Sequence, residues 1–347
     1  MIGTPLALRA FPAPDSGASV ASLLDQVEGS TDIAYTGYVE TLGTLQLPVA
    51  SDLADLGPLF GERTRMRVWW RGPQDWRVDQ ILTTGETDLI HDSRGTTMWE
   101  YEKSRVTRVV DSGARLPRTS DLLPPDLGRR LLEDADLAEL SRLPMQRIAG
   151  RDAPGMRLIP ASAQSSIDHV DIWVDQESGL ALRLVLYAKG ADTAAFSSTF
   201  MQFSTEGPTG TQTTFEPPPD AEFFYDDVVD IADAANQFAS LTPPGSLAGL
   251  HRSSGPALRS VGVYGGGLTQ LVAIPLWDQA AEPLRENLGS VPTVRRIGEG
   301  DVVSVGPLTM LLTGFPGGGG WLLAGTVTEQ TLIEAAHDID RFSQVRQ

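Results

Sequence analysis

Residues 168–190, DHVDIWVDQESGLALRLVLYAKG, contain the pattern that decides the fold. Two runs in this stretch are apolar on alternate residues, first at Val170, Ile172 and Val174 and then at Leu182, Leu184 and Leu186. Such alternation is typical of β-strands with one buried face. Gly179 lies between the runs, where a tight turn favours a residue that tolerates a left-handed backbone. The stretch therefore predicts an antiparallel hairpin.

Similar short runs lie on both sides of this hairpin. Residues 63–70, RTRMRVWW, and residues 76–82, WRVDQIL, are one example, joined by a Gly-Pro turn. Counted along residues 33–204, about eleven such strands follow one another. A meander of that many strands curls under its normal twist. We therefore expect a mainly β (α+β) fold, in which about eleven antiparallel strands form a half-open β-barrel.

Two helices accompany the predicted strands. Residues 16–30 have apolar side chains at helical spacing, and the insertion at residues 119–144 begins its helix at Pro124 and Pro125. The apolar stripe of the inserted helix consists of Leu127, Leu131 and Leu132. We expect this stripe to cover the concave side of the sheet.

The chain is longer than one ordinary core requires, since a domain takes roughly 100 to 200 residues and this chain has 347. A stretch rich in proline and acidic residues separates the strands from a second region, which alternates strands with helices and ends in the helical pattern of residues 328–342. We expect residues 1–15 to be a tail or the remnant of an export segment, 16–228 the half-barrel, 229–246 a linker and 247–347 a small α+β domain.

Charge and composition exclude several classes of protein. The 27 Lys and Arg residues against 45 Asp and Glu residues leave a net charge of −18, which repels nucleic acid. There is no cysteine, so disulfides and thiolate metal sites are absent. No apolar run approaches the roughly 20 residues of a membrane span. The apolar, Pro-rich start is compatible with a trimmed export signal, and we expect an exported protein.

A search for chemistry finds no catalytic or nucleotide-binding motif. Asp168, His169, Asp171 and Asp175 come closest to a metal cluster, but the polar outer face of a strand explains their spacing. The glycines at residues 265–267 precede a strand-like run, which favours a hairpin turn over a phosphate loop. We therefore expect no enzyme, no metal and no cofactor.

The concave side of the half-barrel is the remaining candidate site. A curled sheet that does not close leaves an apolar hollow, which must be filled by helices or by a ligand. The candidate cavity residues are Met66, Val68, Trp70, Trp76, Val78, Trp99, Tyr101, Val170, Ile172, Val174, Leu182, Leu184 and Leu186.

The hairpin at residues 173–183 resembles that of the LolA-like superfamily, and most closely that of the RseB/MucB sigma-E regulatory proteins. Their hairpin reads W-x-D-x-x-[ST]-G-L-x-x-[RK], and the matching structural positions here are Trp173, Asp175, Ser178, Gly179, Leu180 and Arg183. The resemblance extends to the early helix, the inserted helices, FEPPPDAEFF at the exit of the half-barrel, and a smaller C-terminal domain containing VYGGGLTQLVAIPL. Low Lys and high Arg usage indicates a GC-rich genome, such as that of an actinobacterium.

The resemblance implies a noncatalytic extracytoplasmic sensor. In such a protein the half-barrel binds a lipid or other acyl ligand, and the C-terminal domain binds a membrane-anchored, anti-sigma-factor-like regulator. Two alternatives remain open. One is a lipid or lipoprotein carrier of the LolA type, and the other is a ligand-free protein-interaction module whose concave face is plugged by its own helices.

Overall fold

The computed structural model describes residues 17–45, 47, 56–109, 114–225, 231–239, 242–253, 258–289, 293–314 and 319–345. The expected tail, residues 1–15, lies outside them. None of the helices within these ranges is long and apolar enough to cross a membrane.

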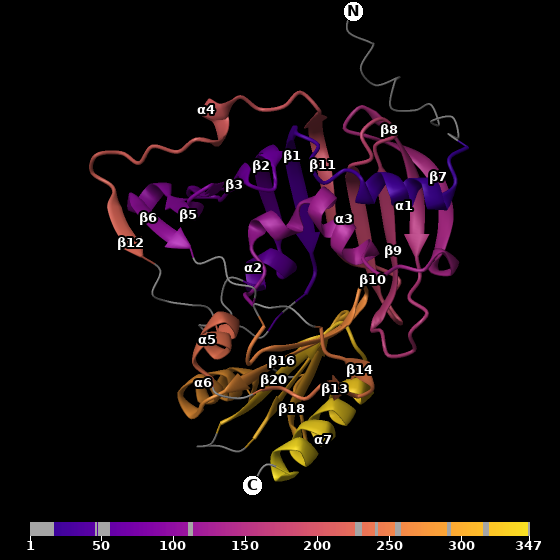
Figure 1. Cartoon of the computed structure of the whole chain (residues 1–347), viewed down its shortest axis with the longest axis vertical. Helices are drawn as coiled ribbons and strands as arrows, with labels where there is room; N and C mark the ends of the chain where they lie inside the picture. The colour runs from indigo at the N-terminus through magenta and orange to yellow at the C-terminus, as the bar shows by residue number, and fades with distance from the viewer. Residues whose placement is uncertain are drawn as a thin grey trace, which may run out of the picture.

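The expected half-open antiparallel barrel is confirmed as a large, unclosed sheet of twelve strands (Figure 1). Its order is β12-β6-β5-β4-β3-β2-β1-β11-β10-β9-β8-β7. The strands are β1 Tyr35–Gly43, β2 Arg63–Gly72, β3 Asp75–Ile81, β4 Glu86–Asp92, β5 Gly95–Glu100, β6 Arg105–Val109, β7 Leu140–Ile148, β8 Arg151–Leu158, β9 Ile167–Val174, β10 Ala181–Ala188, β11 Ala194–Ser204 and β12 Glu222–Tyr225.

The twelfth strand was not expected. β12 pairs parallel with β6, whereas every other neighbouring pair in the sheet is antiparallel. Residues 205–221 form a strap that carries the chain from β11, in the middle of the sheet, to this edge. In Figure 1 the strap arches past strands β2 to β6 before it reaches β12. This strap includes Phe215, whose ring lies 5.5 Å from that of Trp99. The hydrophobic contact attaches the strap to the sheet.

Short helices lie between the strands of the large sheet. They are α1 Val20–Glu28, α2 Leu56–Gly61, the 3-10 turns η3 Tyr101–Lys103, η4 Thr119–Leu122 and η5 Leu137–Glu139, α3 Pro124–Leu132 and α4 Gly210–Thr213. Ser19 caps α1, since its side chain accepts a hydrogen bond from the Ser22 amide. α3 starts at Pro124 as expected, because a proline in the first turn loses no helical hydrogen bond.

The second sheet has six antiparallel strands in the order β15-β16-β20-β19-β18-β17. The elements of this region are α5 Ile231–Phe238, β13 Ser246–Leu247, β14 Leu250–His251, β15 Gly262–Gly266, β16 Thr269–Leu276, α6 Asp278–Gly289, β17 Arg295–Ile297, β18 Gly300–Val305, β19 Leu308–Thr313, β20 Gly320–Gly325 and α7 Glu329–Val345. One apolar cluster joins α5 and α6 to the sheet, and another joins α7 to it. The expected small α+β unit is therefore a layered sheet with its own core.

α5 falls inside the stretch expected to be a linker, residues 229–246. Ile231, Ala232 and Ala235 are buried in the cluster shared with α6. The Asn236 side-chain oxygen also accepts hydrogen bonds from the amides of Arg259 and Ser260. α5 thus packs as part of the second unit, because its apolar face completes that core. Residues 229, 230, 240 and 241 of the expected linker lie outside the described residues.

Candidate functional site

The concave face of the large sheet brings most of the candidate cavity residues together. Ten of them are buried members of one apolar cluster: Met66, Val68, Trp70, Trp76, Val78, Val170, Ile172, Val174, Leu182 and Leu184. Leu186 is half-buried and packs against the same cluster. The register explains this grouping, because Ile172 pairs with Leu184 and Val68 pairs with Val78 across neighbouring strands.

Two of the candidates lie elsewhere. Trp99 belongs to a separate small cluster with Ile90 and Val106, which the strap residue Phe215 covers. β5 ends at Glu100, so Tyr101 lies in the 3-10 turn that follows and is 67% exposed. Neither side chain joins the central cluster, because the alternation places Trp99 on the opposite face of the sheet from Met98, which packs against that cluster.

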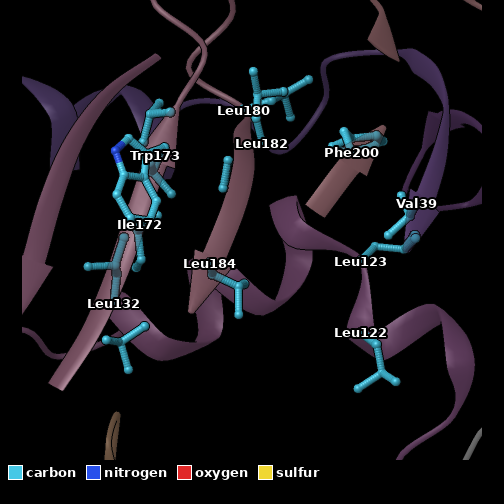
Figure 2. Close-up of a cluster of buried hydrophobic side chains, with 14 of the residues drawn as sticks. Val39, Leu122, Leu123, Leu132, Ile172, Trp173, Leu180, Leu182, Leu184 and Phe200 are labelled. Atoms are coloured by element: carbon cyan, nitrogen blue, oxygen red, sulfur yellow. The ribbon is translucent and has the colours of Figure 1, made fainter. Parts of the chain in front are cut away.

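The chain's own helices fill the concave face. α1 contributes Leu23, Leu24 and Val27 to the central cluster, and the η4–α3 segment contributes Leu122, Leu123 and Leu132. Leu127 and Leu131 are partly buried and pack against it. Figure 2 shows Leu132 of α3 near Ile172, and Leu123 near Val39. A ligand that reached these strands would therefore have to displace a helix.

Four rings form a row across the concave face. Tyr35, Trp70, Trp76 and His91 come from β1, β2, β3 and β4, and each pairs with the next in the strand register. Successive ring centroids lie 5.8, 5.9 and 5.3 Å apart with nearly parallel planes. Tyr35 and His91 were not expected in the site. The sequence did not indicate them, because both residues lie near the ends of their strands and the strand register that aligns them is set by the turns.

α3 also directs polar groups toward this row. Burial raises the pKa of Tyr35 well above its usual range, the negative charge of Asp126 raises it further, and Arg129 lowers it. Asp126 and Arg129 form an ion pair of 2.9 Å one helical turn apart. The row therefore lies beside a charged pair, an arrangement with both apolar and polar groups.

A cavity of about 330 Å³ lies between α1 and α3. Its lining residues are Val27, Glu28, Asp126, Arg129, Arg130, Leu132, Glu133 and Asp134. Ligand pockets are usually apolar with a few polar groups, whereas charged residues dominate this lining. The cavity therefore suits a polar or charged group better than an acyl chain.

An ion-pair network holds the start of α3. The two terminal guanidinium nitrogens of Arg115 donate to Asp121, at 2.6 and 2.9 Å, and Arg130 donates to the same carboxylate at 2.8 Å. The Arg118 amide donates a further hydrogen bond of 2.7 Å. Burial alone would raise the pKa of Asp121, but the Arg115 hydrogen bonds and the Arg115 and Arg130 charges lower it to about 2. The carboxylate is thus a charged anchor for the helix.

The hairpin motif forms a compact turn. The Asp175 carboxylate accepts hydrogen bonds from the Ser178 amide at 3.0 Å and the Ser178 hydroxyl at 2.6 Å. Gly179 has a φ of +74°, and a Cβ there would lie 2.5 Å from the Gln26 carbonyl of α1. Trp173 donates from its ring nitrogen to Pro144, and the Arg183 guanidinium lies over its ring. Leu180 is fully buried in the central cluster.

The carboxylates of β9 correct one expectation. Asp171 and Asp175 were expected on a solvated outer face, but they are only 5% and 1% exposed. Arg157 binds Asp171 with two hydrogen bonds, and Arg151 binds Asp175 with two. The planar guanidinium matches a carboxylate in this way and covers it. Asp171 and Asp175 therefore form buried ion pairs with arginines of β8, the neighbouring strand.

A second buried acidic group was not expected from the sequence. The carboxylate oxygens of Asp79, Glu86 and Asp88 lie within 4.8 Å of one another, and Arg77 donates to both aspartates. Burial raises the pKa of Asp88 to about 7, with Asp79 raising it further and Arg77 lowering it. Among the described residues Asp88 Oδ1 has no hydrogen-bond partner. The only sequence signal was two aspartates on adjacent strands.

Comparison with known proteins identifies the architecture. No family model matches the sequence, and no curated protein matches it either. In a solved complex of MucA and MucB from Pseudomonas aeruginosa, one chain matches 92% of this chain and 97% of its own length, at 17% identity and a TM-score of 0.50. A crystal structure of MucB matches the same shares at 16% identity and a TM-score of 0.49.

A LolA superfamily protein from Nitrosomonas europaea matches 57% of this chain and 99% of its own length, at 12% identity and a TM-score of 0.25. The match to a chain of the MucA/MucB complex agrees with the resemblance inferred from the hairpin. At these identities the likeness concerns the fold alone. The chain therefore resembles MucB in fold, and its own fold is a half-open barrel followed by a small second sheet.

Proposed function

We propose that this chain is a noncatalytic, extracytoplasmic regulator of the RseB/MucB type. In this proposal the half-barrel accepts an acyl chain, and the C-terminal domain binds a membrane-anchored, anti-sigma-factor-like protein. The observation that carries the proposal is the combination of the half-barrel with a second sheet domain over 92% of the chain. One solved structure that matches this chain over that share is a complex of MucB with MucA.

We assign the half-barrel to residues 16–228 and the C-terminal domain to residues 247–347, with α5 between them packed on the second domain. The apolar row on β1 to β4 supports an acyl ligand, since stacked rings and aliphatic side chains offer a continuous apolar surface. Each buried methylene of such a ligand contributes about 0.8 kcal/mol, so one chain has enough binding energy to displace packed side chains.

Two alternatives differ in how the concave face is used. A carrier of the LolA type shares the same surface but must release its ligand to a membrane. A ligand-free interaction module needs no route for a ligand into the half-barrel. The burial of the candidate residues under α1 and α3 favours this second candidate. It predicts that the helices act only as core.

Native mass spectrometry of gently purified protein, followed by denaturing extraction of any adduct, tests the proposal. A bound acyl lipid would support the regulator and the carrier, and transfer of that lipid to protein-free vesicles would identify the carrier. A clean apo mass after incubation with mixed envelope lipids would reject the lipid ligand and leave the interaction module.

A matched pair of variants adds a stability readout. Leu132→Ala removes a side chain that is 2% exposed, whereas Leu137→Ala changes one that is 52% exposed. In a plugged module Leu132→Ala costs about 2 to 5 kcal/mol of unfolding free energy and creates no affinity for lipid. In a ligand-binding half-barrel the same variant also raises the affinity for an acyl probe, while Leu137→Ala leaves affinity and stability unchanged.

A further inference from the structure

The glycine turn at residues 265–268, which consists of the last two residues of β15 and the two residues before β16, reaches from the C-terminal domain to the end of α3. A Cβ on Gly266 would lie 2.6 Å from Asp134 Oδ2, and a Cβ on Gly267 would lie 2.8 Å from the Glu133 backbone oxygen. The Asp134 carboxylate is the end of a flexible side chain and can turn away, whereas the Glu133 oxygen belongs to the backbone and cannot. Gly267 is thus needed for the close approach of the turn to the helix end.

The same turn inserts a side chain into the half-barrel. Leu268 is 5% exposed and belongs to the apolar cluster of the concave face, together with Leu132 of α3 and residues of β9 and β10. The next apolar residues of β16 belong to the cores of the second sheet instead. Leu268 is therefore the point at which the C-terminal domain enters the core that α3 covers.

Hydrogen bonds fix the turn against the half-barrel. The loop between β8 and β9 places the buried Ser165 hydroxyl 3.2 Å from the Leu268 carbonyl, to which it donates. The Gln164 carbonyl accepts from the Thr328 amide at 2.7 Å, and the Gln164 side chain donates to Ala248 at 2.8 Å. These bonds join the second domain to the β8–β9 loop and thereby hold the turn against the half-barrel.

From these contacts we infer that the turn at residues 265–268 is a latch that holds α3 over the concave face. The Asp121 ion pairs join the segment before α3 to Arg130 in the last turn of the helix, and the turn at residues 265–268 lies against Glu133 and Asp134, which follow the helix. Loss of the turn contact frees the C-terminal end of the helix, above Leu132 and the apolar strands. Access to the half-barrel is thereby coupled to the contact between the two domains. The inference rests on the proposed function only for the kind of ligand that enters the half-barrel.

Gly267→Asn tests the latch. Gly267 has a φ of +52°, and asparagine adopts this left-handed conformation more readily than other non-glycine residues. The variant therefore keeps the turn but adds a Cβ against the Glu133 backbone. Gly249→Asn is the matched control, since Gly249 has a φ of +77° in the same domain with nothing within 4 Å of a Cβ.

The readout is amide hydrogen exchange of α3, followed in the full chain by mass spectrometry. We expect α3 to exchange about tenfold faster in Gly267→Asn than in the wild type, because exchange follows the open population. Gly249→Asn is expected to match the wild type. Unchanged exchange of α3 in Gly267→Asn, with β18 and β19 still protected, would overturn the latch.

If Gly267→Asn also deprotects β18 and β19, Leu268→Ala decides. It removes the inserted side chain without changing the turn backbone. Faster exchange of α3 with a protected second sheet supports the latch, and protection of α3 equal to the wild type rejects it.

Binding of the fluorescent fatty acid cis-parinaric acid separates the latch from the proposed function. A tenfold larger open fraction lowers the apparent Kd of an acyl ligand about tenfold. Faster exchange of α3 without any binding of the probe would support the latch and reject the acyl ligand. Tighter binding without faster exchange of α3 would reject the latch and leave the proposed function in place.

Discussion

The Trp70 and Trp76 rings stack across β2 and β3, with centroids 5.9 Å apart and planes 7° from parallel. They pair directly in the strand register, next to the turn that joins the two strands. Tyr35 and His91 continue the stack on either side, so one row of cross-strand pairs fastens four strands. This row therefore links β1, β2, β3 and β4 across the concave face.

Replacing Trp76, which stacks on both Trp70 and His91, should therefore destabilise the half-barrel. We expect Trp76→Ala to lower the free energy of unfolding by about 3 to 5 kcal/mol, since a buried aromatic side chain is lost together with two stacking contacts. Urea unfolding monitored by circular dichroism measures this. Trp277→Ala is the control, because Trp277 is 42% exposed and its loss should change the unfolding free energy by about 0.5 kcal/mol or less. Equal losses in the two variants would contradict the role of the row.

The contribution of Asp88 to the stability of the protein should fall as the pH rises from about 4 to 7. Burial first, and then the charge of Asp79, raises the folded-state pKa of Asp88 to about 7, whereas an unfolded aspartate has a pKa near 3.8. The folded state therefore binds more protons in this window, and its stability decreases with pH. Asp88→Asn should flatten this decrease and raise the urea midpoint at pH 8. A pH profile as steep in Asp88→Asn as in the wild type would argue against this origin, and exposed Asp192→Asn serves as the control.

The Asp121 anchor should have the opposite pH dependence. Its folded-state pKa of about 2 lies below that of an unfolded aspartate, so its contribution to stability is present above pH 4 and is lost as the pH falls through 2. Asp121→Asn removes the carboxylate that Arg115 and Arg130 share, although Arg130 keeps its ion pair with Asp126, and we expect a loss of about 3 kcal/mol at pH 7. Chemical unfolding at pH 7 measures this loss. Glu177→Gln, which changes an exposed partner of Arg151, should cost less than about 1 kcal/mol.

Local patterns in the sequence predict the architecture of the half-barrel well. Alternation and the Gly179 turn were sufficient for β9 and β10, and Pro124 marked the start of α3. The features that sequence reasoning missed depend on contacts between distant segments. β12 reaches β6 only because the strap crosses the sheet, and Leu268 enters the concave core only because the two domains meet. No local pattern contains such information.

The candidate site shows the same division. Ten of the thirteen cavity candidates share one cluster because strand alternation places them on one face. Trp99 and Tyr101 lie outside this cluster. The sequence did not show on which face of β5 Trp99 lies, nor that the strand ends at Glu100, before Tyr101. The buried pairs of Asp171 with Arg157 and of Asp88 with Arg77 required the strand register, since in each pair the two partners lie on adjacent strands.

The turn at Gly179 should depend on close packing against α1 as well as on its backbone angle. A Cβ at this position would lie 2.5 Å from the Gln26 carbonyl, whereas a Cβ at Gly190 meets nothing within 4 Å. Both glycines have a similar positive φ, +74° and +76°. Gly190→Ala should therefore cost only the left-handed backbone penalty of about 1 to 2 kcal/mol. Gly179→Ala should cost more and should increase hydrogen exchange in α1. Equal losses for the two variants would show that α1 moves away freely and that the turn acts through its backbone alone.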